Sequence, residues 1–278
     1  MTNTTTRLES DLATRRREGQ KALVPFFTAG YPDEQTFLEL LAAAARAGCQ
    51  TIEVGIPFSD PVADGPVIQA SSQHVLERGM TLERTLELTG RAAAATGAAL
   101  VLMGYLNPIL RMGLERFADH ARAVGVGGVI VPDVPVEESA ALRRVMDTRG
   151  IAVIDLVAKT SSSERIARIA GEAQGFLYLV SLTGVTGSQV ALDDELDAFV
   201  AQVRATTHLP LFVGFGISGR DEAARAVEYA DGVVIGSAII RLIQSGAGGT
   251  QAVADVEQFL KDIYRTINTA NPISRSQP

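Results

Sequence analysis

Two acidic residues that lie close together in the chain have the types and surroundings needed for acid–base chemistry. The first, Glu53, stands inside an apolar run, Ile52-Glu53-Val54. A carboxyl group in such surroundings loses solvation, which raises its pKa toward the range useful for proton transfer. A glutamate that points outward and pairs with a lysine is the alternative. Glu53 is therefore a candidate acid–base catalyst, with the surface ion pair left open.

The second acid, Asp64, lies at the end of the loop that follows this run. The loop contains three prolines, which restrict its backbone, and one more acid, Asp60. Asp64 is followed by Gly65 and Pro66, where a helix is predicted to begin, and an aspartate at that place can serve as the helix N-cap. The residues alone leave both roles for Asp64 open, a catalytic carboxylate or a cap.

Glycine-rich segments follow three further apolar runs, at Thr183–Ser188, Gly214–Gly219 and Gly236–Ala238. Glycine lets the backbone approach an anion closely, and the amides at a helix start direct their N–H groups toward it. Three such segments together predict a phosphate site. Within the last of them, Ser237 either donates its hydroxyl to the phosphate or caps the helix that follows.

The residues give little support for metal binding or for Schiff-base chemistry. His74, His120 and His208 are scattered, and no group of His, Cys and acids has metal-ligand spacing. Lys159 is the one lysine placed near the end of a predicted strand, as a Schiff-base lysine would be. The remaining hypothesis is metal-free acid–base chemistry on a phosphorylated substrate.

These residues must be positioned by a repeating fold, because short apolar runs and longer amphipathic segments alternate along the chain. Eight such pairs are typical of a closed (β/α)8 barrel, the TIM barrel of the α/β class. A doubly wound open sheet is the rival, but it rarely uses eight near-equal units without a domain break. Two extra helices are predicted, an N-terminal one at Arg7–Glu18 and one after the second strand at Pro66–Glu77. We expect one barrel domain over residues 1–270 and a disordered tail over 271–278.

The expected elements have the following bounds. The strands are Ala22–Thr28, Thr51–Ile56, Ala99–Tyr105, Gly128–Pro132, Ala152–Val157, Phe176–Ser181, Leu211–Phe215 and Gly232–Ile235. The helices between them are Glu34–Ala47, Leu82–Thr96, Leu114–Val124, Glu137–Arg149, Ser163–Ala173, Asp193–Ala205, Asp221–Tyr229 and Ala252–Ile267.

A barrel of this kind carries its active site at the C-terminal ends of the strands. That rule places Glu53 and the glycine segments at the same rim, together with Asp133 and Tyr178. Phe26 and Tyr105 also fall at strand ends, and apolar rings there suit a flat apolar part of a substrate.

The composition limits the classes of molecule that the chain is expected to bind. The chain has 278 residues, 46% of them hydrophobic, and a net charge of −7, which argues against nucleic acid as the main partner. The run Arg15–Arg17 predicts a solvated helix face, with an anionic ligand as the alternative. One cysteine, Cys49, fits a reducing compartment, and no apolar run reaches the length of about 18 residues that spans a membrane. With no signal-peptide pattern at the start, the predicted location is the cytoplasm.

The run from Glu53 to Pro66 reads EVGIPFSDPVADGP, and it resembles the signature of the tryptophan synthase α subunit family. Two segments depart from the family pattern, Lys159, where a proline is expected, and Ser188–Val190. The other segments that carry the resemblance are Pro25–Gly30, Asp133–Ser139, Tyr178, Gly184–Gly187, Gly214–Ser218 and Gly236–Ala238.

The resemblance implies a lyase that cleaves indole-3-glycerol phosphate by a retro-aldol reaction to indole and glyceraldehyde 3-phosphate. It implies that Glu53 shuttles protons, that Asp64 hydrogen-bonds the indole N–H, and that Tyr178 positions Glu53 and the substrate. Thr186 would lie on a loop that closes over the site. The substrate-binding residues expected from the pattern are Phe26, Tyr105, Thr186, Gly187, Gly216, Gly236 and Ser237.

The resemblance also implies a partner. Members of the family pass indole to a β subunit in an α2β2 heterotetramer, and the pyridoxal phosphate belongs to that subunit, so no cofactor is expected in this chain. Two alternatives stay open at this point. One is a stand-alone lyase that releases free indole, and the other is a catalytically silent barrel that regulates a β subunit.

Overall fold

The computed structural model describes residues 7–180, 195–214, 216–246 and 249–269. Within them the strands are short and mostly buried along their whole length, as expected for a parallel sheet covered by helices outside and filled by side chains inside. The strands are β1 (Ala22–Thr28), β2 (Thr51–Gly55), β3 (Ala99–Met103), β4 (Val126–Ile130), β5 (Ala152–Val153), β6 (Asp155–Ala158), β7 (Leu177–Val180), β8 (Leu211–Gly214) and β9 (Gly232–Ile235).

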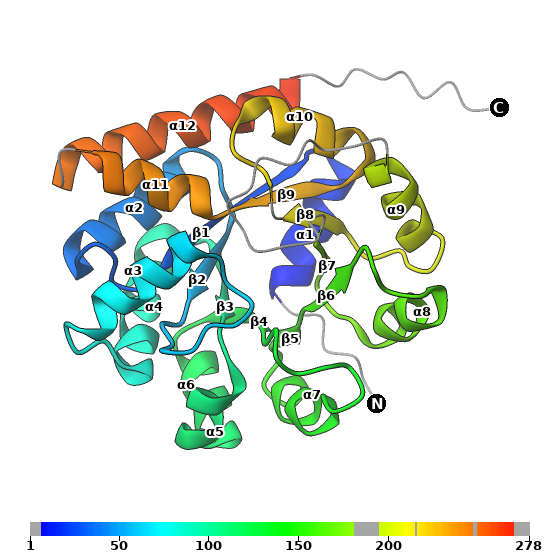
Figure 1. Ribbon diagram of the computed structural model, residues 1–278, viewed down its shortest axis with the longest axis horizontal. Helices are drawn as coiled ribbons and strands as arrows, with labels where there is room; N and C mark the ends of the chain where they lie inside the picture. The colour runs from blue at the N-terminus through cyan, green and yellow to red at the C-terminus, as the bar shows by residue number, and fades with distance from the viewer. Residues whose placement is uncertain (1–6, 181–194, 215, 247–248, 270–278) are drawn as a thin grey trace.

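All strand pairs are parallel, and their order is β5-β4-β3-β2-β1-β9-β8-β7-β6. The two strands at the ends of this order, β5 and β6, are separated only by Ile154. The chain itself therefore closes the sheet, and β5 and β6 together correspond to the predicted strand Ala152–Val157. Figure 1 shows the helices arranged around the strands. The predicted TIM barrel is confirmed.

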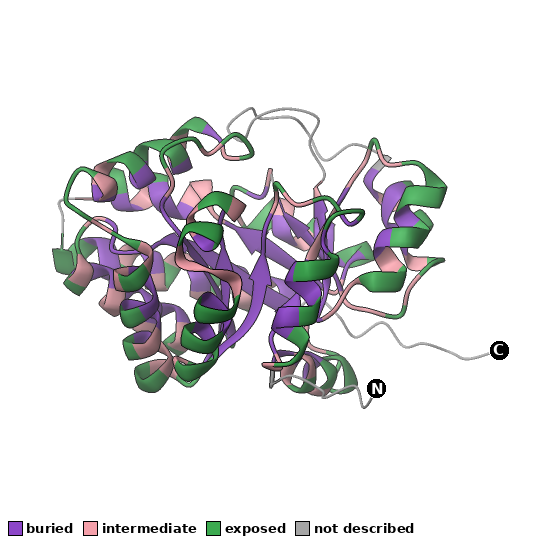
Figure 2. Ribbon diagram, turned by 90° about the horizontal axis from the view of Figure 1, so that it is seen from below, coloured by how far each residue is buried: buried purple, intermediate pink, exposed green. Residues whose placement is uncertain are grey.

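The helices of the described residues follow the strands in turn. Figure 2 shows buried strands in the interior and exposed outer faces on the helices around them. The helices are α1 (Arg7–Arg17), α2 (Glu34–Arg46), α3 (Pro66–Leu76), α4 (Leu82–Thr96), α5 (Leu106–Met112), α6 (Leu114–Ala123), α7 (Ala140–Asp147), α8 (Ser163–Glu172), α9 (Glu195–Arg204), α10 (Arg220–Tyr229), α11 (Ser237–Ser245) and α12 (Gly249–Thr269).

Several features differ from the prediction. Helix α5 was not expected, because seven residues are too few to show a helical period, and Gly113 (φ 96°) separates it from α6. Helix α11 was not among the predicted helix ranges; it ends before Gly246, and the predicted helix Ala252–Ile267 corresponds to α12. Strand β4 lies two residues earlier than predicted, at Val126–Ile130. The predicted tail, 271–278, lies outside the described residues.

Helix α1 packs against β3 and β4 near the N-terminal end of the barrel, where its Leu8 is fully buried. The extra helix α3 lies near the opposite end. It is joined to β1 by a buried hydrogen bond of 2.6 Å between the hydroxyls of Thr28 and Ser71. Since Asp64 lies just before α3, this contact helps to hold the loop that carries Asp64 against the barrel.

Candidate active site

Glu53 lies at the centre of β2, paired in register with Phe26 of β1 and Val101 of β3. Its side chain is 1% exposed, and neither carboxylate oxygen has a hydrogen-bond partner in the part of the chain that the structure describes. The alternative of a glutamate that points outward to a lysine is therefore wrong. Burial, with the negative charge of Asp64 adding to it, raises the pKa of Glu53 to about 8.

Glu53 faces a pocket at the C-terminal ends of the strands. Seven of the ten predicted site residues line this pocket together, whereas Thr186 and Gly187 lie outside the described residues. The lining residues are Phe26, Glu53, Asp64, Ile68, Met103, Tyr178, Gly216, Ile217, Val234, Gly236 and Ser237. The pocket thus combines two carboxyl groups, two aromatic rings and two glycine segments.

Four apolar lining residues were missed from the sequence, namely Ile68, Met103, Ile217 and Val234. For Met103 a signal was present, because alternation along β3 places it on the same side as Val101, the register partner of Glu53. The others needed the three-dimensional arrangement.

Asp64 is held by the tenth predicted residue, Tyr105. The Tyr105 hydroxyl donates to Asp64 Oδ2 at 3.1 Å and accepts the Ala63 N–H at 3.0 Å. The Phe58 ring stacks on Tyr105, with ring centroids 5.1 Å apart. Burial raises the pKa of Asp64 to about 6, and the hydrogen bond from Tyr105 limits the rise.

The alternative role of Asp64 as a helix cap is wrong. Helix α3 begins at Pro66, its N-cap is Gly65, and no side chain caps it. The carboxylate of Asp64 lines the pocket instead. The loop therefore places a carboxyl group in the lining of the pocket.

Tyr105→Phe tests how much this hydrogen bond contributes. A hydrogen bond to a charged group contributes about 1.5–3 kcal/mol, so kcat/KM should fall by roughly 10- to 100-fold. Because the bond from Tyr105 lowers the pKa of Asp64, its loss should raise that pKa and move the acidic limb of the pH–rate profile upward. Phe58→Leu, which keeps the hydroxyl, is the control. An acidic limb that does not move would contradict the role of Tyr105.

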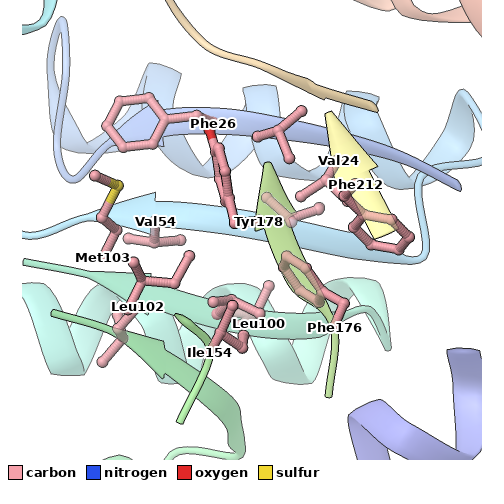
Figure 3. Close-up of a cluster of buried hydrophobic side chains, with 14 of the residues drawn as sticks. Val24, Phe26, Val54, Leu100, Leu102, Met103, Ile154, Phe176, Tyr178 and Phe212 are labelled. Carbon is pink, nitrogen blue, oxygen red and sulfur yellow. The ribbon is translucent and has the colours of Figure 1, made fainter. Parts of the chain in front are cut away.

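Tyr178 of β7 is 6% exposed and lies against Gly214 of β8. Figure 3 shows its ring among the buried side chains of the barrel interior, with Phe26 nearby. Burial, with the charges of Glu53 and Asp64, holds the pKa of Tyr178 well above its usual value. The phenol therefore keeps its proton in the pocket and can serve as a hydrogen-bond donor.

Gly214→Ala tests the position of Tyr178. A Cβ at Gly214 would lie 2.2 Å from Tyr178 Cε1 and 2.4 Å from its hydroxyl, so the ring must move. Misplacement of about 1 Å near reacting groups can cost roughly 100-fold, and we expect kcat/KM to fall by about 10- to 100-fold. The matched control is Gly171→Ala in α8, where a Cβ meets nothing within 4 Å. Activity equal to that of the control would show that the position of Tyr178 is unimportant.

The side of the pocket formed by β8 and β9 suits a phosphate. Helix α11 begins at Ser237 with Gly236 as its N-cap, so the alternative of Ser237 as the N-cap is wrong. No acidic residue lies in the first turn of α11, and its amide N–H groups and dipole favour an anion. Gly216 has φ 85°, a conformation that glycine adopts most readily. Gly216, Gly236 and Ser237 line one pocket, as the predicted phosphate site requires.

The remaining polar candidates have structural partners. Asp133 accepts the N–H of Leu106 through both carboxylate oxygens, at 3.0 and 3.2 Å. Asp60 accepts the hydroxyl of Ser59, and His74 bonds the carbonyl of Pro32. Among the described residues there is no group of three His, Cys, Asp or Glu side chains arranged to hold a metal ion. In the same part of the chain, none of the helices has the length and apolarity needed to cross a membrane.

Known proteins are similar to this chain in sequence and in fold. The family model described as tryptophan synthase alpha chain matches residues 12–268. A tryptophan synthase alpha chain of Geobacter sp. (strain M21) is 46% identical over 242 residues, which cover 87% of this chain and 91% of the relative. That of Synechococcus elongatus is 42% identical over 264 residues, covering 95% of this chain and 97% of the relative.

Solved structures of tryptophan synthase have a similar fold. The tryptophan synthase alpha chain from Legionella pneumophila subsp. pneumophila has a TM-score of 0.87 and 33% identity, and covers 98% of this chain and 100% of its own. A chain of Mycobacterium tuberculosis tryptophan synthase also has a TM-score of 0.87, with 31% identity, and covers 95% of this chain and 99% of its own. The chain therefore belongs to the tryptophan synthase alpha chain family.

Proposed function

We propose that Glu53 and Asp64 divide the acid–base and electrostatic work of the reaction of this family. That reaction is the cleavage of indole-3-glycerol phosphate to indole and glyceraldehyde 3-phosphate, and the chain is a lyase of this type. The observation that carries the proposal is one pocket with two carboxyl groups of different pKa, about 8 for Glu53 and about 6 for Asp64. At neutral pH, Glu53 is mostly protonated and Asp64 mostly ionised. Two environments therefore give two carboxyl groups opposite roles.

The lining of the pocket favours one orientation of the substrate. Its phosphate belongs at the N-terminus of α11, beside Gly216 and Ser237, because that side offers amide N–H groups. Its indole ring belongs against Phe26 and the apolar residues, with the ring N–H toward Asp64. The glycerol carbons then lie between the two ends, next to Glu53 and Tyr178.

In the first step, the carboxyl group of Glu53 gives its proton to C3 of the indole ring. Positive charge then develops on the ring nitrogen, and the carboxylate of Asp64 stabilises it by accepting the N–H. This interaction strengthens as the reaction proceeds, which is the condition for rate acceleration.

In the second step, the carboxylate of Glu53 takes the proton of the hydroxyl on the carbon attached to the ring. The C–C bond to the ring breaks, the aldehyde forms, and the bonding electrons return to the ring and neutralise it as indole. Glu53 ends protonated, ready for the next turnover. Tyr178, which keeps its proton, orients Glu53 and the glycerol hydroxyl.

We further propose that the chain works in the cytoplasm with a β subunit in an α2β2 assembly, and that pyridoxal phosphate is bound by that subunit. Two exposed apolar side chains support a protein contact near the pocket. Val62, in the loop before Asp64, is 81% exposed, and Leu110 on α5 is 51% exposed. Isolated apolar exposure is common, but both lie on segments that follow strand ends at the pocket side.

Turnover of indole-3-glycerol phosphate, measured with and without a β subunit, tests this proposal. We expect slow indole release by the isolated chain and a marked increase with the partner. Strong activity alone with no stimulation would instead support a stand-alone lyase. Undetectable release at saturating β subunit would support a silent regulatory barrel.

A further inference from the structure

A second hollow opens at the end of the barrel opposite the pocket. Its volume is about 730 Å³, and it is lined by the end of α1, the entry to β1 and the segments before β8 and β9. The pocket residues lie at strand ends, whereas these segments lie at strand beginnings, so the two sites are at opposite ends. A neighbouring hollow of about 780 Å³ shares Arg16 and Arg17 as lining residues.

The hollow is rich in positive charge. Of the acids that line it, Asp231 already pairs with Arg204 and accepts the Leu211 N–H at 2.9 Å. The other acid is the exposed Glu228. The cationic lining residues are Arg15, Arg16, Arg17, Lys21 and Arg204. An excess of cations remains in a protein whose net charge is −7.

Arg15 contributes a buried positive charge beside the hollow. Its side chain is buried at 4% exposure, and Nη2 donates to the Gly48 carbonyl at 3.1 Å. Its Nη1 has no hydrogen-bond partner, and no carboxylate of the described residues forms an ion pair with it. Nη1 is itself buried, so it does not touch a ligand in the hollow, but the uncompensated positive charge of Arg15 lies beside the hollow and favours an anion there.

Two neighbouring arginines can supply the contacts to an anion. Arg16 and Arg17 are exposed, and each uses one guanidinium nitrogen within the protein. Arg16 Nη1 donates to the His208 carbonyl at 2.5 Å, and Arg17 Nη2 donates to Thr14 Oγ1 at 3.1 Å. Their other N–H groups are available for phosphate oxygens, which guanidinium groups bind in pairs.

We propose that this hollow binds a small polyanion of the phosphate type, held by the exposed Arg16 and Arg17 beside the buried positive charge of Arg15. Inorganic polyphosphate and the phosphates of a nucleotide share this chemistry. The ring of Tyr229, 51% exposed at the hollow, offers a surface for a nucleotide base. The solvated helix face expected of Arg15–Arg17 then describes only Arg16 and Arg17, because Arg15 is buried.

Isothermal titration of the full chain with pyrophosphate tests the site. We expect one equivalent to bind, and binding to weaken at least about tenfold in the double variant Arg16→Gln/Arg17→Gln, since this variant removes the charge-assisted hydrogen bonds to the phosphate oxygens. The control is Arg122→Gln/Arg144→Gln, which removes two exposed arginines elsewhere and should bind as the parent does. Equal weakening in both double variants would overturn the proposal, because it would show only a general charge effect.

The same titration at saturating glycerol 3-phosphate separates this site from the pocket. We expect the binding of pyrophosphate to remain. If glycerol 3-phosphate abolishes it and the arginine variants do not change it, the anion binds at the N-terminus of α11. The inference would then be overturned while the proposed function stands.

Arg15→Met supplies a readout that does not depend on the exposed arginines. Pyrophosphate should raise the Tm of the parent chain, and this rise should shrink in Arg15→Met, because the buried positive charge beside the hollow is gone. An unchanged rise would contradict the role of Arg15. Titration of Tyr229→Ala with ATP and with pyrophosphate then separates the two ligand sources. Selective weakening of ATP supports a nucleotide, and equal binding of both supports an inorganic polyphosphate.

Discussion

Glu53→Gln is expected to lower kcat for indole release by roughly 10²–10⁴-fold, the usual contribution of a positioned acid–base group. Glutamine has nearly the same volume as glutamate, but its amide can neither give nor take the proton at C3. Because the lost interaction belongs to the transition state, KM should change little. Steady-state kinetics with saturating β subunit measure both constants. Activity within about tenfold of the parent would show that proton transfer does not depend on Glu53.

The stability of this variant separates catalysis from folding. The folded-state pKa of Glu53 is raised above that of the unfolded chain, so its contribution to stability is complete below the unfolded pKa and is lost as pH rises through about 8. The neutral amide does not lose that contribution. The Tm of Glu53→Gln should therefore equal or exceed that of the parent at pH 8, and a large loss of Tm would assign the effect to misfolding.

The pH–rate profile adds a further check on the same residue. In the parent, kcat/KM should fall above about pH 8 as Glu53 loses its proton, and below about pH 6 as Asp64 gains one. Glu53→Gln should lose the alkaline limb in its residual activity. If the alkaline limb persists in Glu53→Gln, the loss of activity at high pH is due to the titration of another group.

The sequence predicts the barrel well because its strands are continuous apolar runs. The bounds of β1 and β9 agree with the prediction, since each run is flanked by polar or glycine residues. Helix α5 was not predicted, because its seven residues are too few to show a helical period of hydrophobic residues. The break at Ile154 was also not predicted, since the strands β5 and β6 lie in one largely apolar run.

In the candidate site, some residue positions could be predicted from the sequence and others could not. The apolar run around Glu53 made it a candidate for an inward carboxyl group, with an outward ion pair left open, and the structure shows the inward position. The role of Asp64 could not be decided in the same way, because it depends on which residue takes the N-cap conformation. The bond between Tyr105 and Asp64 joins residues 41 positions apart, and no local pattern records it.

Asp64→Asn is expected to lower kcat/KM by roughly 10²–10³-fold, the usual cost of removing one group that stabilises charge in the transition state. Asparagine keeps the shape of the side chain and an oxygen that can accept the Tyr105 hydroxyl, so the loop should stay in place. What disappears is the negative charge opposite the ring nitrogen. Because Gly65 and not Asp64 is the N-cap of α3, the Tm should change little.

The same substitution should alter the titration of Glu53. The charge of Asp64 raises the pKa of Glu53, so its removal should lower that pKa and move the alkaline limb of the pH–rate profile downward. Asp60→Asn, an exposed aspartate on the same loop, is the control and should leave both the rate and the limb unchanged. Unaltered turnover together with a lower Tm would show that Asp64 has only a structural role. A slow variant with a shifted alkaline limb would instead show that the charge of Asp64 acts in catalysis and also sets the pKa of Glu53.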